Sequence, residues 1–166
     1  MTLREIQAPI KARYMSEPAA AMITLRATGA AAGEDGSMSC SVDLGRALYA
    51  AGAHPGVGGS GMAACSGDLL LGALAACAQI TCQMVAANMG LDDLAISATV
   101  EGDLDLRGTL GTADVPVGFE SIRVRFDIAG DAPQERLAKL RERTEKYCVV
   151  LQTLLTSPSI ETTWSE

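Results

Sequence analysis

The most hydrophobic part of the chain is an uninterrupted apolar run near its middle. Residues 69–91 contain no charged side chain, and the run lies between Asp68 and Asp92. It is long enough to cross a membrane, which takes about 20 residues. However, its second half carries four hydrogen-bonding side chains, and the Trp, Lys and Arg anchors that flank membrane spans are missing. The pattern therefore favours a buried helix of a soluble protein, in its core or at a subunit interface.

The residues at the two ends of this run are typical of helix termini. Ser66 is a suitable N-cap, and Asp68 places a negative charge near the positive end of the helix dipole. Gly90 suits the left-handed conformation that follows the last turn of many helices. We therefore expect one long helix within residues 65–90.

Alternation of apolar and polar residues predicts strands on both sides of this helix. Four stretches show it: residues 21–30, 37–44, 94–106 and 119–128. Asp35-Gly36 is a typical hairpin signal between the first two stretches, and residues 107–118 read as a loop between the last two. The glycine-rich segment 45–64 predicts a helical turn at 46–51 followed by a mobile loop.

A second helix is predicted after the last of these strands. Residues 131–134 form a capping box with Pro133 in the first turn, and an apolar stripe with solvated charges on the other face follows. Residues 148–155 extend or bend this helix, Pro158 ends it, and 160–165 can close as a final strand. We therefore predict an α+β fold: an N-terminal arm or short helix over 1–20, then a single domain over 21–166.

Composition and charge argue against some classes of function and location. The formal net charge of −7 argues against nucleic-acid binding, which needs a basic surface. The first residues, MTLREIQAPIK, lack the apolar core of a secretory signal. The chain has 5 cysteines, an odd number, and no CxxC pair, which indicates reduced thiols in a cytoplasmic protein rather than a secreted disulfide framework.

Cys77 and Cys82 share the predicted central helix but cannot bridge each other. Five residues of helix separate them by about 7.5 Å of rise and roughly 140° of rotation, whereas a disulfide needs its Cα atoms within roughly 4.4–6.8 Å. If Cys77 is redox-active, its partner must come from elsewhere in the fold. Cys148 is the natural candidate because its helix must pack on the central one, and Cys65 is the second.

The other candidate residues have simpler interpretations. A free cysteine most often packs as a small hydrophobic residue, and we interpret Cys40 and Cys82 in this way. His54 is the chain's single histidine, and a structural or solvent role is favoured for it. His and Cys do not occur at zinc-ligand spacing, and a Ser/His/Asp site would have no nucleophile elbow. We therefore expect no metal and no bound cofactor.

Two segments resemble the OsmC/Ohr family of thiol peroxidases. They are SGDLLLGALAAC, which ends at Cys77, and EKYCVVLQTL, which contains Cys148. The resemblance covers about residues 21–165. It implies an intertwined homodimer in which antiparallel sheets wrap buried central helices, and the active sites lie at the dimer interface.

The resemblance also implies a mechanism. Cys77 would attack an organic hydroperoxide and become a sulfenic acid, and Cys148 would resolve it to a disulfide. A dithiol such as dihydrolipoamide would reduce that disulfide. An alternative is a homodimer that binds an apolar small molecule and whose cysteines are structural.

The attack needs a thiolate, and burial raises a thiol's pKa, so a cation is expected beside Cys77. By resemblance this is an arginine held by a carboxylate, and we expect Arg46 first and Arg26 second. Asp68 lies about 13 Å along the helix from Cys77, so it could contribute only indirectly or across the dimer. The chain departs from the family at Gly67, where a glutamate is common, and at Val149, where a proline is common.

Overall fold

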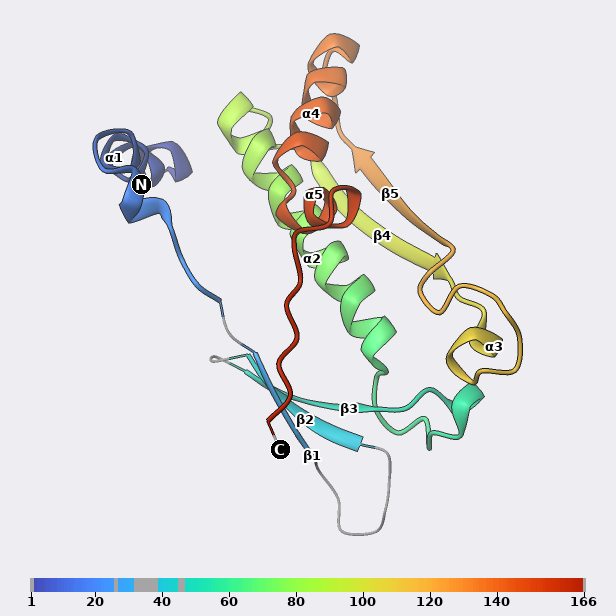
Figure 1. The fold of residues 1–166 in the computed structure, drawn as a ribbon. Coiled ribbons are helices and arrows are strands. Elements are labelled where there is room, and N and C mark those ends of the chain that lie inside the picture. Colours follow the sequence, from blue (N-terminus) through green and yellow to red (C-terminus); the bar gives the residue numbers. More distant parts are fainter. Residues whose placement is uncertain (1, 26, 32–38, 45–46, 166) are drawn as a thin grey trace. The chain divides into compact units, whose positions relative to one another are not determined.

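The structure is a computed structural model that describes residues 2–25, 27–31, 39–44 and 47–165 (Figure 1). Its helices and strands are, in chain order, α1 (Leu3–Ser16), β1 (Thr28–Ala31), β2 (Ser39–Asp43), β3 (Leu48–Gly52), α2 (Ser66–Met89), β4 (Ala95–Asp103), α3 (Leu106–Thr109), β5 (Ser121–Ala129), α4 (Gln134–Tyr147) and α5 (Val149–Leu155). Short 3-10 turns occur at Pro18–Ala21 and Pro55–Val57. The mixture of helices and antiparallel strands agrees with the predicted α+β class.

The chain divides into two compact units. One consists of Met1–Gly72 with Val100–Arg123, and the other of Ala73–Thr99 with Val124–Glu166. We refer to them as the first and second units, and α2, β4 and β5 contribute residues to both. The division into an arm, 1–20, and a single domain, 21–166, stays a prediction.

The N-terminal segment forms a helix rather than an extended arm. A capping box starts α1: the backbone N–H of Thr2 donates to Glu5 Oε2 at 2.7 Å, and the N–H of Glu5 donates to Thr2 Oγ1 at 3.3 Å. These bonds satisfy backbone donors that would otherwise lack partners in the first turn.

The first unit contains a three-stranded antiparallel sheet in the order β1-β2-β3. The predicted strand 21–30 is only partly confirmed, because β1 begins at Thr28. The helical turn predicted at 46–51 is wrong. Leu48–Gly52 is a strand that pairs with β2 from Leu48↔Asp43 to Ser39↔Gly52, so its backbone groups are satisfied in a sheet. The hairpin turn predicted at 33–36 lies outside the described residues.

Helix α2 confirms the predicted central helix. Its N-cap is Cys65 rather than Ser66, because Leu69 N–H donates to the Cys65 carbonyl at 3.1 Å. The Asp68 carboxylate accepts the Cys65 N–H at 2.9 Å. At the other end, Gly90 has a φ of 65°, in the left-handed region as predicted. Within the described residues, α2 alone is long and apolar enough to cross a membrane, a property that core helices of soluble proteins share.

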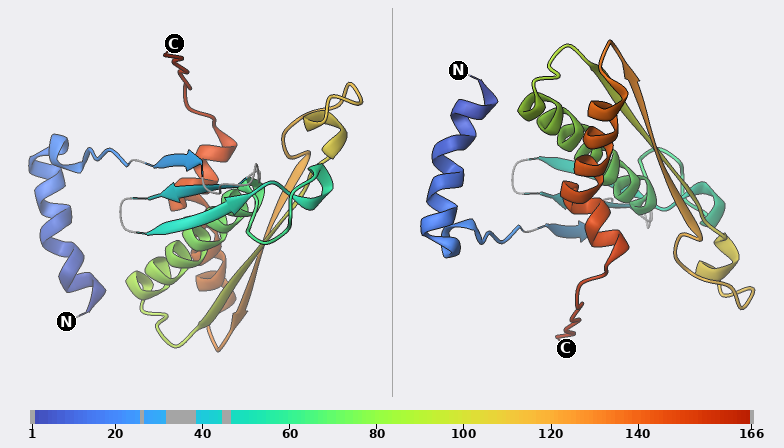
Figure 2. Two further views of the ribbon diagram at one scale, coloured as in Figure 1. Left: turned by 90° about the horizontal axis from the view of Figure 1, so that it is seen from below. Right: turned by 90° about the horizontal axis from the view of Figure 1, so that it is seen from above.

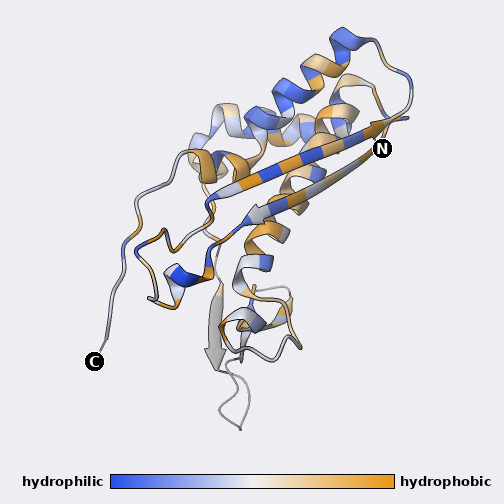
Figure 3. Cartoon of the chain, turned by 90° about the vertical axis from the view of Figure 1, so that its right-hand side faces the viewer, coloured by the Kyte–Doolittle hydropathy of each residue, from blue (hydrophilic) through white to orange (hydrophobic). Residues whose placement is uncertain are grey.

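Strands β4 and β5 pair as a two-stranded sheet and confirm the predictions at 94–106 and 119–128. Half-buried and exposed residues alternate along both strands, and Figure 3 shows the matching alternation of hydropathy. The predicted loop between them contains the short helix α3, which starts where the Asp105 side chain accepts the Arg107 N–H at 2.9 Å.

The core of the second unit lies where α2 and α4 pack on one face of the strands (Figure 2). Its most buried residues are Cys82, Val85, Ala86, Leu91 and Leu140. Two polar side chains at this packing are paired with backbone carbonyls. Gln79 Nε2 donates to the Ile96 carbonyl at 2.8 Å, and the Arg136 guanidinium donates to the Met89 carbonyl in the last turn of α2. The alanine and leucine of α2 thus pack closely without leaving these polar groups unsatisfied.

Two predictions near the C-terminus need correction. The capping box at 131–134 does not form: Pro133 is the N-cap of α4, and no side chain caps it. The strand predicted at 160–165 is absent from the described chain, where these residues have no regular structure and Trp164 is 91% exposed. A strand needs a neighbour for its backbone groups, and no described strand pairs with this segment.

Candidate functional site

The second unit brings Cys77 and Cys148 together. Cys77 lies in the middle of α2 and is partly buried, whereas Cys148 lies between α4 and α5 and is 1% exposed. Both are free thiols, and each affects the pKa of the other. Cys148, the first candidate partner of Cys77 in the sequence analysis, thus interacts with it in the structure, while the chemical roles of both residues stay a prediction.

A break between two helices positions Cys148. Its N–H completes α4 by donating to the Thr144 carbonyl at 3.0 Å, and its carbonyl begins α5 by accepting the Gln152 N–H at 2.9 Å. Cys148 itself is extended, with φ −73° and ψ 104°. Two β-branched residues, Val149 and Val150, follow, and such residues favour the helix less than alanine or leucine do. The sequence thus supports a bend here rather than one continuous helix.

The bend turns the first amides of α5 toward Cys77. The first N–H groups of any helix lack partners within the helix, so they can donate to another group. Burial raises the pKa of Cys77, but the N–H of Val150, the Cys148 thiol, the Thr81 hydroxyl and the N–H of Val149 all lower it. Thr81 Oγ1 lies 3.9 Å from the Cys77 sulfur. The net effect lowers the pKa of Cys77 below that of an ordinary cysteine.

Cys148 shifts in the opposite direction. Burial raises the pKa of the Cys148 thiol, and hydrogen bonding and charge repulsion from Cys77 raise it further, against the N–H groups of Leu151 and Val150. Of the two thiols, Cys77 is therefore the more readily ionised. Two interacting thiols, one of them more readily ionised, are the components of two-cysteine redox chemistry.

The structure does not test the cation predicted beside Cys77. Arg46 and Arg26 lie outside the described residues. No charged side chain of the described chain contributes to the pKa shift of Cys77, which comes from amides, a thiol and a hydroxyl. The prediction of an activating cation is therefore untested.

Asp68 belongs to a different cluster in the first unit. It caps α2 at Cys65, and together with His54 these residues line a small cavity of about 250 Å³. Hydrogen bonds from the Cys65 N–H and thiol lower the pKa of Asp68, and the charge of His54 lowers it slightly more. His54 accepts the Gly56 N–H on Nδ1 at 3.0 Å, which fixes its ring. The position of Asp68 is thus explained by helix capping.

Cys82 is a core residue, as expected for a packing thiol. It is 2% exposed, and burial raises the pKa of Cys82, partly offset by the Thr144 hydroxyl. Across the part of the chain that the structure describes, no three His, Cys, Asp or Glu residues gather as a metal site. Cys40 has no described side chain.

Sequence reasoning missed the groups that act most directly on Cys77. The amides of Val149 and Val150 carry no signal of residue type, because any residue except proline supplies one. Thr81 could have been found: it lies four positions after Cys77, and residues four apart are neighbours on a helix surface.

Solved structures of similar fold come from several bacteria. The chain resembles an OsmC-like protein from Mycoplasma pneumoniae with a TM-score of 0.64 and 18% identity, covering 81% of this chain and 89% of that one. It resembles an organic hydroperoxide resistance protein OsmC from Legionella pneumophila with a TM-score of 0.60 and 21% identity, covering 82% and 92%. For the organic hydroperoxide resistance protein OhrB of Bacillus subtilis the values are 0.51, 18%, 82% and 94%. At these identities the likeness establishes the fold.

Comparison with curated proteins gives no match. The sequence model of one family, described as OsmC-like protein, matches residues 58–163. The match covers more than half of the chain and includes both Cys77 and Cys148. The chain therefore belongs to the OsmC-like protein family.

Proposed function

We propose that this protein is a thiol peroxidase that reduces organic hydroperoxides through Cys77 and Cys148. The observation that carries the proposal is the environment of Cys77: helix amides and the Cys148 thiol lower its pKa although burial opposes ionisation. A thiolate is the nucleophilic form of cysteine. The names of the Legionella and Bacillus proteins, which refer to organic hydroperoxide resistance, support this class of substrate.

In the first step the Cys77 thiolate attacks the outer oxygen of the hydroperoxide. The O–O bond breaks, an S–O bond forms, and the alkoxide leaving group takes up a proton to give the alcohol. The sulfur is oxidised by two electrons to a sulfenic acid, and the peroxide is reduced. The raised pKa of Cys148 favours its protonated form, so this neighbouring thiol can be a source of that proton.

In the second step Cys148 attacks the sulfenic sulfur of Cys77. The S–O bond breaks, a disulfide forms, and hydroxide leaves as water after taking up a proton. An external dithiol of the lipoamide type then reduces the disulfide by thiol–disulfide exchange and becomes a disulfide itself. We propose no metal or organic cofactor for either step.

We further propose that the protein acts as a cytoplasmic homodimer. In the single chain several large apolar residues of α2 remain exposed: Leu70, Ile80 and Met84. A second copy that covers them would explain an uncharged helix with part of its surface in water. Such a copy could also bring a cation to Cys77, and Arg46 and Arg26 remain our candidates for it.

The test measures consumption of cumene hydroperoxide with dihydrolipoamide as the reductant. Cys77→Ser should abolish consumption, because serine cannot form the sulfenic acid. Cys65→Ser is the matched control: it changes a partly buried thiol in the other unit and should retain activity. Consumption that persists in Cys77→Ser, or an inactive native protein, would overturn the proposal.

A further inference from the structure

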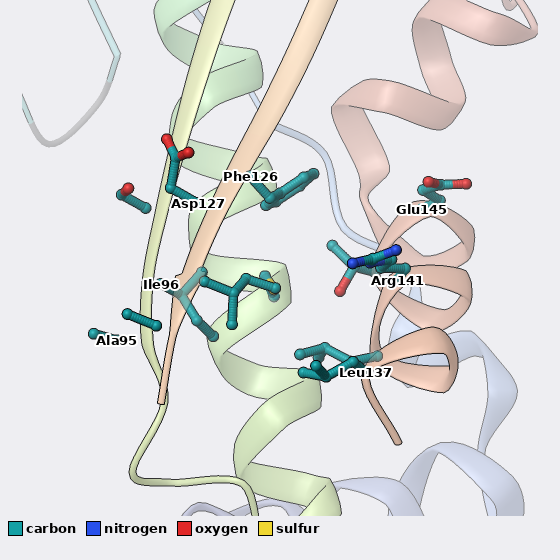
Figure 4. Close-up of a pocket in the computed structure, with 13 residues that line it drawn as sticks. Ala95, Ile96, Phe126, Asp127, Leu137, Arg141 and Glu145 are labelled. Atoms are coloured by element: carbon teal, nitrogen blue, oxygen red, sulfur yellow. The ribbon is translucent and has the colours of Figure 1, made fainter. Parts of the chain in front are cut away.

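The second unit contains a cavity that the thiol pair does not use. It has a volume of about 720 Å³, within the roughly 300–1,000 Å³ range of small-molecule sites. Side chains of α4 form one wall and residues of β4 and β5 form the opposite wall, as Figure 4 shows. Cys82 of α2 also lines it.

The walls of this cavity are mainly apolar. Ile96 comes from β4, Phe126 and Ile128 come from β5, and Leu137 and Leu140 come from α4. All of them except the fully buried Leu140 are partly exposed. Partly exposed apolar walls favour a ligand whose body is hydrocarbon, because its binding removes apolar surface from water.

A buried hydroxyl lines the same cavity without a good partner. Thr144 is 2% exposed, and its Oγ1 makes no well-formed hydrogen bond within the described chain. The polar group beside it is the Cys82 thiol, which is a weak hydrogen-bonding partner. Buried polar groups in native proteins are normally satisfied. An unsatisfied hydroxyl in a cavity wall therefore marks a place where a ligand can supply the missing bond.

One cationic side chain, that of Arg141, lines the cavity. Arg141 is exposed and makes no ion pair within the described chain, and its guanidinium extends from α4 toward the strands. Within the described chain, neither Asp127 nor Glu145, the two carboxylates that line the cavity, forms an ion pair with Arg141. Asp127 pairs with Arg125 at 3.1 Å, and the Glu145 side chain lies farther from the strands along α4. A guanidinium binds a carboxylate through two parallel hydrogen bonds.

The cavity and the thiol pair lie on different faces of α2. Cys82, which lines the cavity, follows Cys77 by five positions, which is roughly 140° around a helix. Neither Cys77 nor Cys148 lines the cavity. A ligand here would not occupy the position of a hydroperoxide at the Cys77 sulfur.

We propose that this cavity binds a small carboxylic acid with an apolar body, such as a medium-chain fatty acid. Its carboxylate pairs with Arg141 and its hydrocarbon lies between the strands and α4. Movement of the walls on binding brings the Thr144 hydroxyl within reach of a polar group of the ligand or of a water that enters with it. This site does not depend on the proposed peroxidase activity.

The test follows the isoleucine methyl signals of the full chain by NMR during titration with decanoate, below its micelle concentration. The methyls of Ile96 and Ile128 should shift saturably, whereas Ile160, which is exposed and outside the cavity, should not. Decan-1-ol serves as the matched ligand without a charge. Arg141→Gln should weaken decanoate binding at least about tenfold and leave decan-1-ol binding unchanged.

Arg143→Gln is the matched control, because Arg143 is exposed on the same helix and does not line the cavity. It should bind decanoate like the native chain, and so should Cys77→Ser, which separates this site from the peroxidase proposal. Absence of saturable shifts at Ile96 and Ile128 would overturn the site. Equal effects of Arg141→Gln on both ligands, or none on either, would overturn the assignment of a carboxylate.

Discussion

The thiols of Cys77 and Cys148 interact, and the pKa of Cys77 is lowered whereas that of Cys148 is raised. Amides at the start of α5 lower the pKa of Cys77 against the effect of burial, while burial and the interaction with Cys77 raise the pKa of Cys148. The thiol of Cys77 is thus the easier of the two to ionise. The distinction arises from the bend at Cys148, because that bend turns free N–H groups toward α2.

This difference predicts the pH dependence of thiol reactivity. An ordinary cysteine ionises near pH 8.5, and the pKa of Cys77 is lowered whereas that of Cys148 is raised. As pH rises, Cys77 should therefore become reactive first, with a midpoint below that of a free thiol. Iodoacetamide labelling of the reduced protein, followed site by site by mass spectrometry, measures both midpoints. A midpoint for Cys77 above that of Cys148 would contradict the assignment.

Replacing Val149 by proline should raise the pKa of Cys77. Proline has no N–H, so the substitution removes one of the amides that stabilise the thiolate. The backbone can accept the change, because Val149 is the first residue of α5 and Cys148 is already extended. The pH midpoint of Cys77 labelling should increase in Val149→Pro and remain native in Val149→Ala, which keeps the N–H. An unchanged midpoint in Val149→Pro would show that this amide does not act on Cys77.

Val149 also clarifies one departure from the family pattern. The resemblance described above implies a proline at this position, whereas the valine here keeps an N–H that lowers the pKa of Cys77. At Gly67 the chain lacks a carboxylate, and a side chain there would contact Phe119 and the Cys65 sulfur.

Removing the second thiol should trap the intermediate of the proposed reaction. In Cys148→Ser the Cys77 sulfenic acid has no neighbouring thiol to condense with, so it should persist after one equivalent of cumene hydroperoxide. Mass spectrometry after dimedone treatment should find the adduct on Cys77 in this variant and a Cys77–Cys148 disulfide in the native chain. Cys82→Ala is the control and should form the disulfide. A native chain that forms neither product would argue against the mechanism.

The regular elements with strong local patterns could be predicted from the sequence. Helix α2 carries no charge after Asp68 and is followed by Gly90, and β4 and β5 alternate cleanly because one face of each is half-buried. Residues 46–51 were mispredicted because their alanines and leucine have no clear period. Pairing with β2, a nonlocal interaction, determines that Leu48–Gly52 is a strand.

The sequence could predict the cysteine side chains of the candidate site but not the backbone groups that surround them. Spacing on α2 excluded a Cys77–Cys82 bridge and directed attention to Cys148, which does lie beside Cys77. The amides of Val149 and Val150 depend on a backbone bend, and residue types alone do not specify the direction of a bend. The Cys65 N-cap was missed for a related reason: serine is the commoner cap, but the Asp68 carboxylate reaches the Cys65 N–H.

The core between α2 and α4 should be most sensitive at Leu140. This side chain is 0% exposed, whereas Leu137 on the same helix is only partly buried. Leu140→Ala removes buried methyl groups and leaves a cavity, which costs about 2–5 kcal/mol in the free energy of unfolding. Leu137→Ala is the matched control and should cost less. Urea unfolding measures the loss of unfolding free energy in each variant. Equal losses would show that the core does not depend more on Leu140 than on Leu137.

The cap of α2 should make stability depend on pH in the acid range. The pKa of Asp68 is lowered by hydrogen bonds from Cys65, so its carboxylate stabilises the fold above its unfolded pKa of about 3.9. This contribution is lost as pH falls through the lower, folded value. Because Asp68 is exposed and screened, we expect it to be small, about 0.3–1 kcal/mol at low salt.

Asp68→Asn tests this contribution directly. Asparagine keeps the size of the side chain and can still accept the Cys65 N–H, but it carries no charge near the start of α2. The native chain should be more stable than the variant at pH 7, and the two unfolding free energies should converge as the pH is lowered below 3.9. Asp114→Asn, in the loop after α3, is the control, because Asp114 is not in the first turn of a helix. A native-to-variant difference that stays constant from pH 7 to pH 3 would show that the negative charge of Asp68 does not stabilise α2.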